Sequence, residues 1–117
     1  MVLAIVSDLL FRAKIEAAAA QAGVPVTVAA GGAALVRALT EGRWSRALID
    51  LSGSAGDPLA SVVAARQAGV PEIIGYCSHV DTALQTRALA AGCHQVLPRS
   101  AFVQRLPELL AAPPVSR

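Results

Sequence analysis

The chain has 117 residues, of which 55% are hydrophobic and 15% charged, and its net charge is +2. This length suits one domain with a substantial core, while the ten lysines and arginines are spread too thinly for a nucleic-acid-binding stripe. No uninterrupted apolar run approaches the roughly 18 residues of a membrane span. The sequence begins without a basic leader and its two cysteines form no CxxC pair, so we expect a soluble protein of the cytoplasm.

Strand and helix patterns alternate along the sequence. The strand segments are short, apolar and rich in β-branched residues, as in a sheet buried on both faces, and glycine follows most of the helical segments. The predicted strands are residues 2–6, 24–28, 46–51, 72–77 and 94–97, and the predicted helices are residues 8–22, 33–41, 57–68 and 81–91, followed by a last helix capped by Ser100.

Pro107 lies within the last helical segment. An internal proline costs about 3 kcal/mol, so we expect a kink there or a short turn before a restart, and a frayed tail over residues 113–117. Repeated strand–helix units with short connections require right-handed crossovers and a parallel sheet. The sequence therefore predicts one α/β domain over residues 1–112, a three-layer sandwich built on a five-stranded parallel sheet.

Two aspartates end predicted strands. Asp8 follows the first strand and Asp50 ends the third. Neighbouring parallel strands bring such residues to one edge, where open α/β sheets bind their ligands. Asp8 could equally cap the helix that follows it, as aspartate commonly does.

The order and spacing of these residues resemble the receiver domains of two-component response regulators, a flavodoxin-like family, over nearly the whole chain. The resemblance implies that the five strands follow the order 2-1-3-4-5. Asp50 stands at the family's phosphorylated aspartate, and Asp8 matches the second acid of the first-strand pair, the one that contacts the metal. Ser7 replaces the first acid. Cys77 stands where the fourth strand ends in Thr or Ser, and Arg99 stands where the fifth ends in lysine.

Other positions also depart from the family pattern. Ser78 offers a hydroxyl one residue after the expected place, Ser100 replaces the proline, and Val96 stands where many receivers have a Tyr or Phe that changes rotamer on activation. The resemblance implies a weak Mg²⁺ site made by Asp8, Asp50 and the backbone carbonyl of Ser52, because Mg²⁺ accepts one or two carboxylates with waters.

Arg99 keeps the positive charge of the lysine with a different shape, and the Cys77 thiol is a weak hydrogen-bond donor. Arg99 could also form a permanent ion pair with Asp50 or Asp8. Cys77 is more simply read as a small buried hydrophobe than as a reactive thiol.

The resemblance and its departures lead to two hypotheses. The first, which we favour, is a stand-alone pseudo-receiver that signals through protein contacts; the alternative is a conventional response regulator with Mg²⁺-dependent phosphorylation of Asp50. Neither is an enzyme. A histidine kinase, another signalling protein or a second copy is the expected partner, and DNA and membranes are not. A small-molecule-binding domain has no specific motif to support it.

Receivers commonly signal through the fourth helix, fifth strand and fifth helix. The corresponding residues here are Arg87, Ala91, Val96, Phe102, Val103 and Leu106, several of which must belong to the core.

A zinc site is the remaining possibility, because cysteine and histidine are the usual ligands of zinc. Cys77 and His79 follow the end of the fourth strand, whereas Cys93 and His94 precede the fifth, at the opposite edge of a parallel sheet. One ion could not reach all four side chains.

Overall fold

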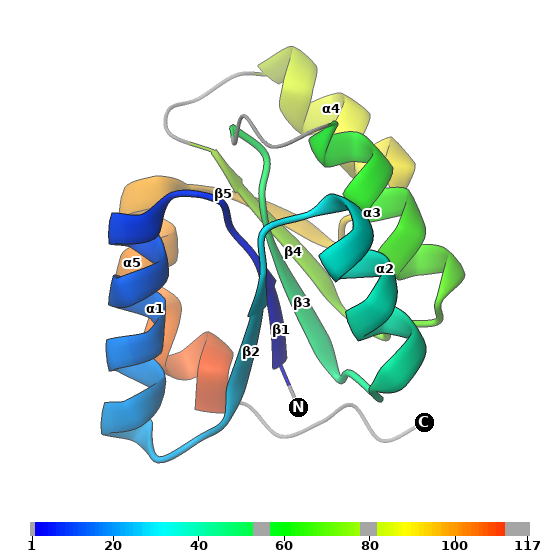
Figure 1. The fold of residues 1–117 in the computed structure, drawn as a ribbon. Coiled ribbons are helices and arrows are strands. Elements are labelled where there is room, and N and C mark those ends of the chain that lie inside the picture. The colour runs from blue at the N-terminus through cyan, green and yellow to red at the C-terminus, as the bar shows by residue number, and fades with distance from the viewer. Residues whose placement is uncertain (1, 53–56, 78–81, 112–117) are drawn as a thin grey trace.

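The computed structural model describes residues 2–52, 57–77 and 82–111. Five parallel strands form one sheet in the order β2-β1-β3-β4-β5, as predicted, and helices cover both faces. In Figure 1, α1 and α5 lie on one face of the sheet, and α2, α3 and α4 lie on the other. The elements are β1 Val2–Ile5, α1 Leu9–Ala22, β2 Val26–Ala29, α2 Gly32–Glu41, β3 Arg46–Asp50, α3 Pro58–Gln67, β4 Ile73–Cys77, α4 Thr82–Ala91, β5 Gln95–Pro98 and α5 Arg99–Ala111.

Burial follows the position of each strand in the sheet. Almost every residue of β1, β3 and β4 is buried, because these strands have a strand on each side and helices above and below. The outer strands β2 and β5 are mostly half-buried. The sheet thus has three apolar inner strands and two more open margins.

Capping explains where the first helix begins and ends. Asp8 Oδ1 accepts hydrogen bonds from the backbone N–H groups of Leu10 and Phe11, and Gly23 adopts a left-handed conformation with φ of 70° after the last turn. The N–H of Val24 still donates to the carbonyl of Ala19, so Val24 belongs to this helix end. For this reason β2 begins at Val26, two residues later than the sequence suggests.

The last helix differs from the prediction. It begins at Arg99, so Ser100 lies in its first turn and is not the cap, and it continues through Pro107 without stopping. Leu106, Leu109 and Leu110 are buried on either side of the proline. Packing of these leucines offsets the roughly 3 kcal/mol that an internal proline costs.

The end of α5 is also tied to the sheet. The side chain of Arg46, at the start of β3, donates to the carbonyl of Leu109 and forms an ion pair with Glu72. Within the described residues, no helix is both long enough and apolar enough to cross a bilayer.

Candidate functional site

The two predicted aspartates lie at the same edge of the sheet. Asp50 is the last residue of β3, and Asp8 follows β1, whose Ile5 lies beside Ile49. Asp50 is 7% exposed, whereas Asp8 is open to solvent. The two carboxylates therefore meet at one edge, as expected from the sequence, with Asp50 buried and Asp8 exposed.

Both carboxylates accept hydrogen bonds from backbone N–H groups close in the sequence. Asp8 caps α1, which confirms the capping interpretation, and Asp50 Oδ1 accepts a hydrogen bond of 2.9 Å from the N–H of Ser52. A carboxylate can accept about four hydrogen bonds, so these contacts are compatible with a further ligand.

The oxygen atoms that could bind Mg²⁺ are of the right type but few. Asp8, Asp50 and the carbonyl of Ser52 are all oxygen ligands, which Mg²⁺ prefers. Among residues 2–52, 57–77 and 82–111, no three acidic, histidine or cysteine side chains gather closely enough to hold a metal. Any bound Mg²⁺ must keep several waters, and it would supply charge neutralisation beside Asp50.

Arg99 follows β5 directly, at the same edge of the sheet as the aspartates. Its guanidinium carbon is 5.0 Å from the centre of the Phe11 ring, which is the geometry of a cation–π contact. Its Nε is buried without a hydrogen-bond partner among the described residues. Arg99 takes no part in the ion pairs found in that part of the chain, where the possible pairing with Asp50 or Asp8 is not among them.

Three aromatic rings lie directly below this edge, on the α1/α5 face. Tyr76 of β4 stacks on Phe102 of α5 at 4.1 Å between ring centres, and Phe11 of α1 lies 5.0 Å from Tyr76. We call Phe11, Tyr76 and Phe102 the aromatic cluster. No sequence pattern marked Phe11 or Tyr76 as part of a site. The scarcity of aromatic residues, only 3% of the chain, was the available signal.

Tyr76 connects the aromatic cluster to the charged residues. Its side chain is fully buried, and its hydroxyl has no hydrogen-bond partner among the described residues. Burial raises the pKa of Tyr76 far above its ordinary value; Asp50 raises it further, Arg99 opposes the shift and Asp8 adds to it. The hydroxyl therefore lies within the electric field of all three charged groups.

Cys77 is buried at the end of β4, beside Pro98 of β5, as a small apolar residue would be. Ser78 and His79 lie outside the described residues. Val96 is half-buried and packs against the core, so it is not an exposed switch residue in this structure.

Cys93 and His94, the other two side chains weighed as zinc ligands, have structural roles. His94 Nδ1 accepts a hydrogen bond from the N–H of Ile73, and Cys93 is buried next to Gly75 at the opposite edge from Cys77. This arrangement agrees with the topological argument against a shared zinc ion.

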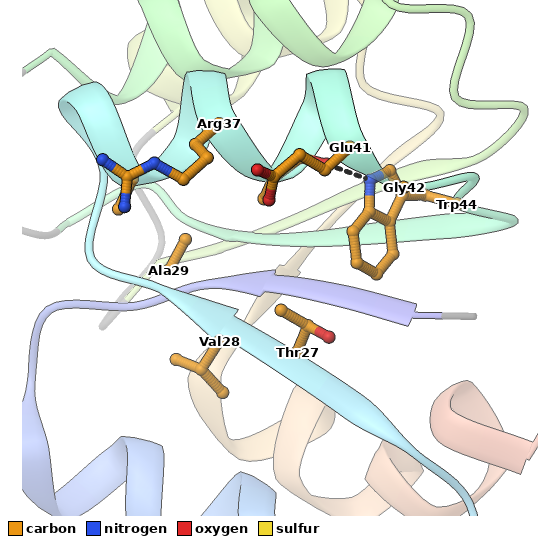
Figure 2. Close-up of a pocket in the computed structure, with 9 residues that line it drawn as sticks. Thr27, Val28, Ala29, Arg37, Glu41, Gly42 and Trp44 are labelled. Atoms are coloured by element: carbon orange, nitrogen blue, oxygen red, sulfur yellow. Dashed lines mark hydrogen bonds between the residues drawn. The ribbon is translucent and has the colours of Figure 1, made fainter.

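A pocket of about 350 Å³ opens between β2 and α2, away from the aspartates. We call it the β2 slot; Figure 2 shows Arg37 and Glu41 extending over it from α2, with the Trp44 ring at one end. Trp44 Nε1 donates to the carbonyl of Ala38, which fixes the ring. The slot is lined by Thr27, Val28, Ala29, Ala34, Arg37, Ala38, Glu41, Gly42 and Trp44.

No protein-family model and no curated protein matches the sequence. Solved structures do match. The signal receiver domain of NarL from Mycobacterium tuberculosis is 21% identical with a TM-score of 0.75, covering 92% of this chain and 89% of that one. The receiver domain of a sensor histidine kinase from Pseudomonas aeruginosa, described with magnesium in its active-site cleft, is 20% identical with a TM-score of 0.74, covering 95% and 97%.

The chemotaxis protein CheY4 from Vibrio cholerae is 20% identical with a TM-score of 0.77, covering 93% of this chain and 97% of that one. At such identities the likeness establishes the architecture and leaves the chemistry to the residues of the site. The chain has the fold of the response-regulator receiver domains.

Proposed function

We propose that this protein is a cytoplasmic signalling module of the two-component type that works as a pseudo-receiver, through protein contacts that do not require phosphorylation. The observation that carries the proposal is the position of Arg99. The guanidinium that would neutralise a phosphoryl oxygen at Asp50 contacts the ring of Phe11 in this structure.

This position is costly to leave. The Arg99 guanidinium is partly desolvated, and a desolvated cation–π contact contributes about 2 kcal/mol. Turning the guanidinium from Phe11 toward a phosphoryl group on Asp50 would weaken that contact. Arg99 therefore connects α1 to the start of α5 and favours one arrangement of these helices without a phosphate.

Cys77 supports the same proposal. Receivers place a hydroxyl there to hold a phosphoryl oxygen, and a thiol donates only weakly. Cys77 is buried, and Val96 packs against the core rather than switching at the surface. Neither Cys77 nor Val96 is the residue type through which receivers usually couple phosphorylation to their output face.

The partner is a histidine kinase or another signalling protein. The surface of α4, β5 and α5 is the expected output face, although Phe102 and Leu106 within it are fully committed to the core. The surface open to a partner is therefore formed by exposed residues of α4 such as Arg87 and Leu89, and by Gln104 of α5.

The alternative is a conventional phospho-acceptor. Its support is the placement of Asp50 at the end of β3, with Asp8 and Arg99 close enough to act on the same tyrosine. In that reaction a carboxylate oxygen of Asp50 attacks the phosphorus of acetyl phosphate, the bond to the acetyl oxygen breaks, and acetate leaves. Mg²⁺ held by Asp8, Asp50 and the Ser52 carbonyl would screen the charge.

Intact-protein mass after incubation with acetyl phosphate and Mg²⁺ separates the two functions. We expect no phosphoryl adduct on the folded wild type, and none on Asp50→Asn. An adduct on the wild type alone would establish the conventional receiver instead.

A double variant tests whether Cys77 and Arg99 are the residues that prevent phosphorylation of Asp50. The double variant Cys77→Thr with Arg99→Lys restores the family's residues at the two positions that would contact the phosphoryl group, so we expect it to accept phosphate at Asp50. Addition of Asp50→Asn to this double variant should abolish the adduct, which would assign it to that carboxylate.

A further inference from the structure

The outer edge of β2 is an unpaired strand edge in the described sheet. β2 pairs only with β1, and the N–H of Val6 donates to the carbonyl of Ala29. Since the N–H and C=O groups of successive strand residues point to alternate sides, Val26 and Val28 direct theirs away from β1. The backbone groups of Val28 therefore face the open margin.

This edge is only partly protected against pairing. Natural edge strands are commonly shielded by shortness, proline, charged residues or a bulge; β2, Val-Thr-Val-Ala, is four residues long but carries no charged residue. Pro25 precedes the strand and does not interrupt it. The edge is therefore able to accept another strand over its whole length.

The β2 slot lies above this edge, and its lining explains its shape. Ala34 and Ala38 are small, so α2 leaves a hollow over the strand, while the Trp44 ring closes one end. A Cβ on Gly42 would come within 2.5 Å of the Trp44 ring, so that ring is closely seated. In Figure 2 Arg37 lies toward the Ala29 end of the slot and Glu41 toward the Thr27 end.

We propose that the occupant of this edge is a second copy of the chain, paired β2 to β2 in antiparallel fashion about a two-fold axis at Val28. The two Val28 residues would then exchange N–H to C=O hydrogen bonds, and Val26 would pair with Ala30 of the second copy. The two sheets join into one continuous sheet across the interface.

The charges above the strand fit this arrangement. Arg37 and Glu41 stand one helical turn apart on α2, both are exposed, and neither takes part in an ion pair among the described residues. A two-fold axis between them places Arg37 opposite Glu41 of the second copy, and the reverse. Each dimer thus gains two complementary contacts from one pair of residues.

A second copy fits better than an unrelated peptide because the complementarity is built into the chain itself. The surface also lies apart from Asp8, Asp50 and Arg99 and from the α4/β5/α5 face. The pairing is therefore independent of phosphorylation, and its test can fail without affecting the proposed function.

Charge exchange between the two positions tests the pairing. Arg37→Glu places like charges opposite each other, as does Glu41→Arg, so each variant alone should dimerise roughly tenfold more weakly than the wild type at low salt. An equal mixture of the two variants restores opposite charges and should form heterodimers about as well as the wild type forms homodimers. Sedimentation velocity over a concentration series measures all four samples.

Arg87→Glu is the matched control, since it makes the same charge change on α4 at an exposed residue. Arg87→Glu should dimerise as strongly as the wild type. Trp44, the only tryptophan of the chain, should change its fluorescence on dilution of the wild type and of the mixed variants, and at roughly tenfold higher concentration for either variant alone.

Three outcomes would overturn the proposal. A wild type that remains monomeric at millimolar concentration leaves β2 without this partner. A mixture that associates no better than its separate components contradicts the two-fold contact. A dimer broken by Arg87→Glu and not by Arg37→Glu would place the interface on the α4/β5/α5 face instead.

Discussion

The two faces of the sheet are packed in different ways, although adjacent residues of β4 supply both. Tyr76 points into the α1/α5 face, where it stacks on Phe102 and lies near Phe11. Gly75 points into the opposite face, where a Cβ would come within 2.7 Å of Leu51 and 3.2 Å of the Cys93 sulfur. One face is filled by large rings and the other by closely fitting aliphatic and small side chains.

The charged residues of the site belong to the aromatic face. Asp50 shares the strand face of Leu48, which packs with the aromatic cluster, and Arg99 rests on Phe11. The charged residues of the site are therefore in direct contact with the packing between the sheet and α1 and α5. The opposite face supplies stability and carries no ionised group near the aspartates among its buried residues.

The largest expected effect comes from removing a ring of the aromatic cluster. Phe102→Ala should lower the free energy of unfolding by about 3–5 kcal/mol, because Phe102 is fully buried and its loss leaves a cavity beside Tyr76. Urea unfolding measures the loss. The near-UV circular dichroism of Tyr76, the only tyrosine, should also weaken.

Val62→Ala is the matched control, since Val62 is equally buried on the opposite face. It should lower stability while leaving the tyrosine signal unchanged. Equal loss of that signal in both variants would show that the two faces are not independent.

Alkaline pH should act through one titratable group on each face. Burial raises the pKa of Cys93 from 9.0 to about 11, partly offset by its hydrogen bond with the backbone of Gly75. Because the folded pKa lies above the unfolded value, this contribution is fully present below pH 9 and is lost between pH 9 and 11, by at most about 2–3 kcal/mol. Urea unfolding at pH 8 and pH 10.5 should show the loss.

Cys93→Ala should remove this part of the pH dependence, whereas Cys77→Ala should keep it. The pKa of Tyr76 is also raised by burial, so absorbance at the tyrosinate band should rise only as the protein unfolds. Ionisation of Tyr76 in the native protein would contradict its enclosure within the aromatic face.

The smallest effect is expected for Tyr76→Phe. The Tyr76 hydroxyl has no partner among the described residues, so its removal eliminates a buried polar group and keeps the ring stack. We expect unchanged stability or a gain of up to about 1 kcal/mol. A loss above about 1 kcal/mol would indicate that a buried water or Arg99 satisfies the hydroxyl in solution.

Periodicity and turn residues were sufficient to predict the secondary structure. The apolar runs of β1, β3 and β4 and the caps Asp8 and Asp57 carry local signals that do not depend on the rest of the fold. The errors arose where distant packing outweighs local preference. The helix continues through Pro107 because buried leucines on both sides hold it against the sheet.

The sequence by itself determined the parallel sheet, the meeting of Asp8 and Asp50 at one edge, and the separation of the two Cys/His groups, because strands joined by crossover helices run parallel. The strand order followed from the resemblance to receiver domains. Only the tertiary structure decided which group Arg99 contacts, which rings surround Tyr76 and how the β2 slot is shaped. These depend on side chains from segments far apart in the chain, whose packing local patterns do not encode.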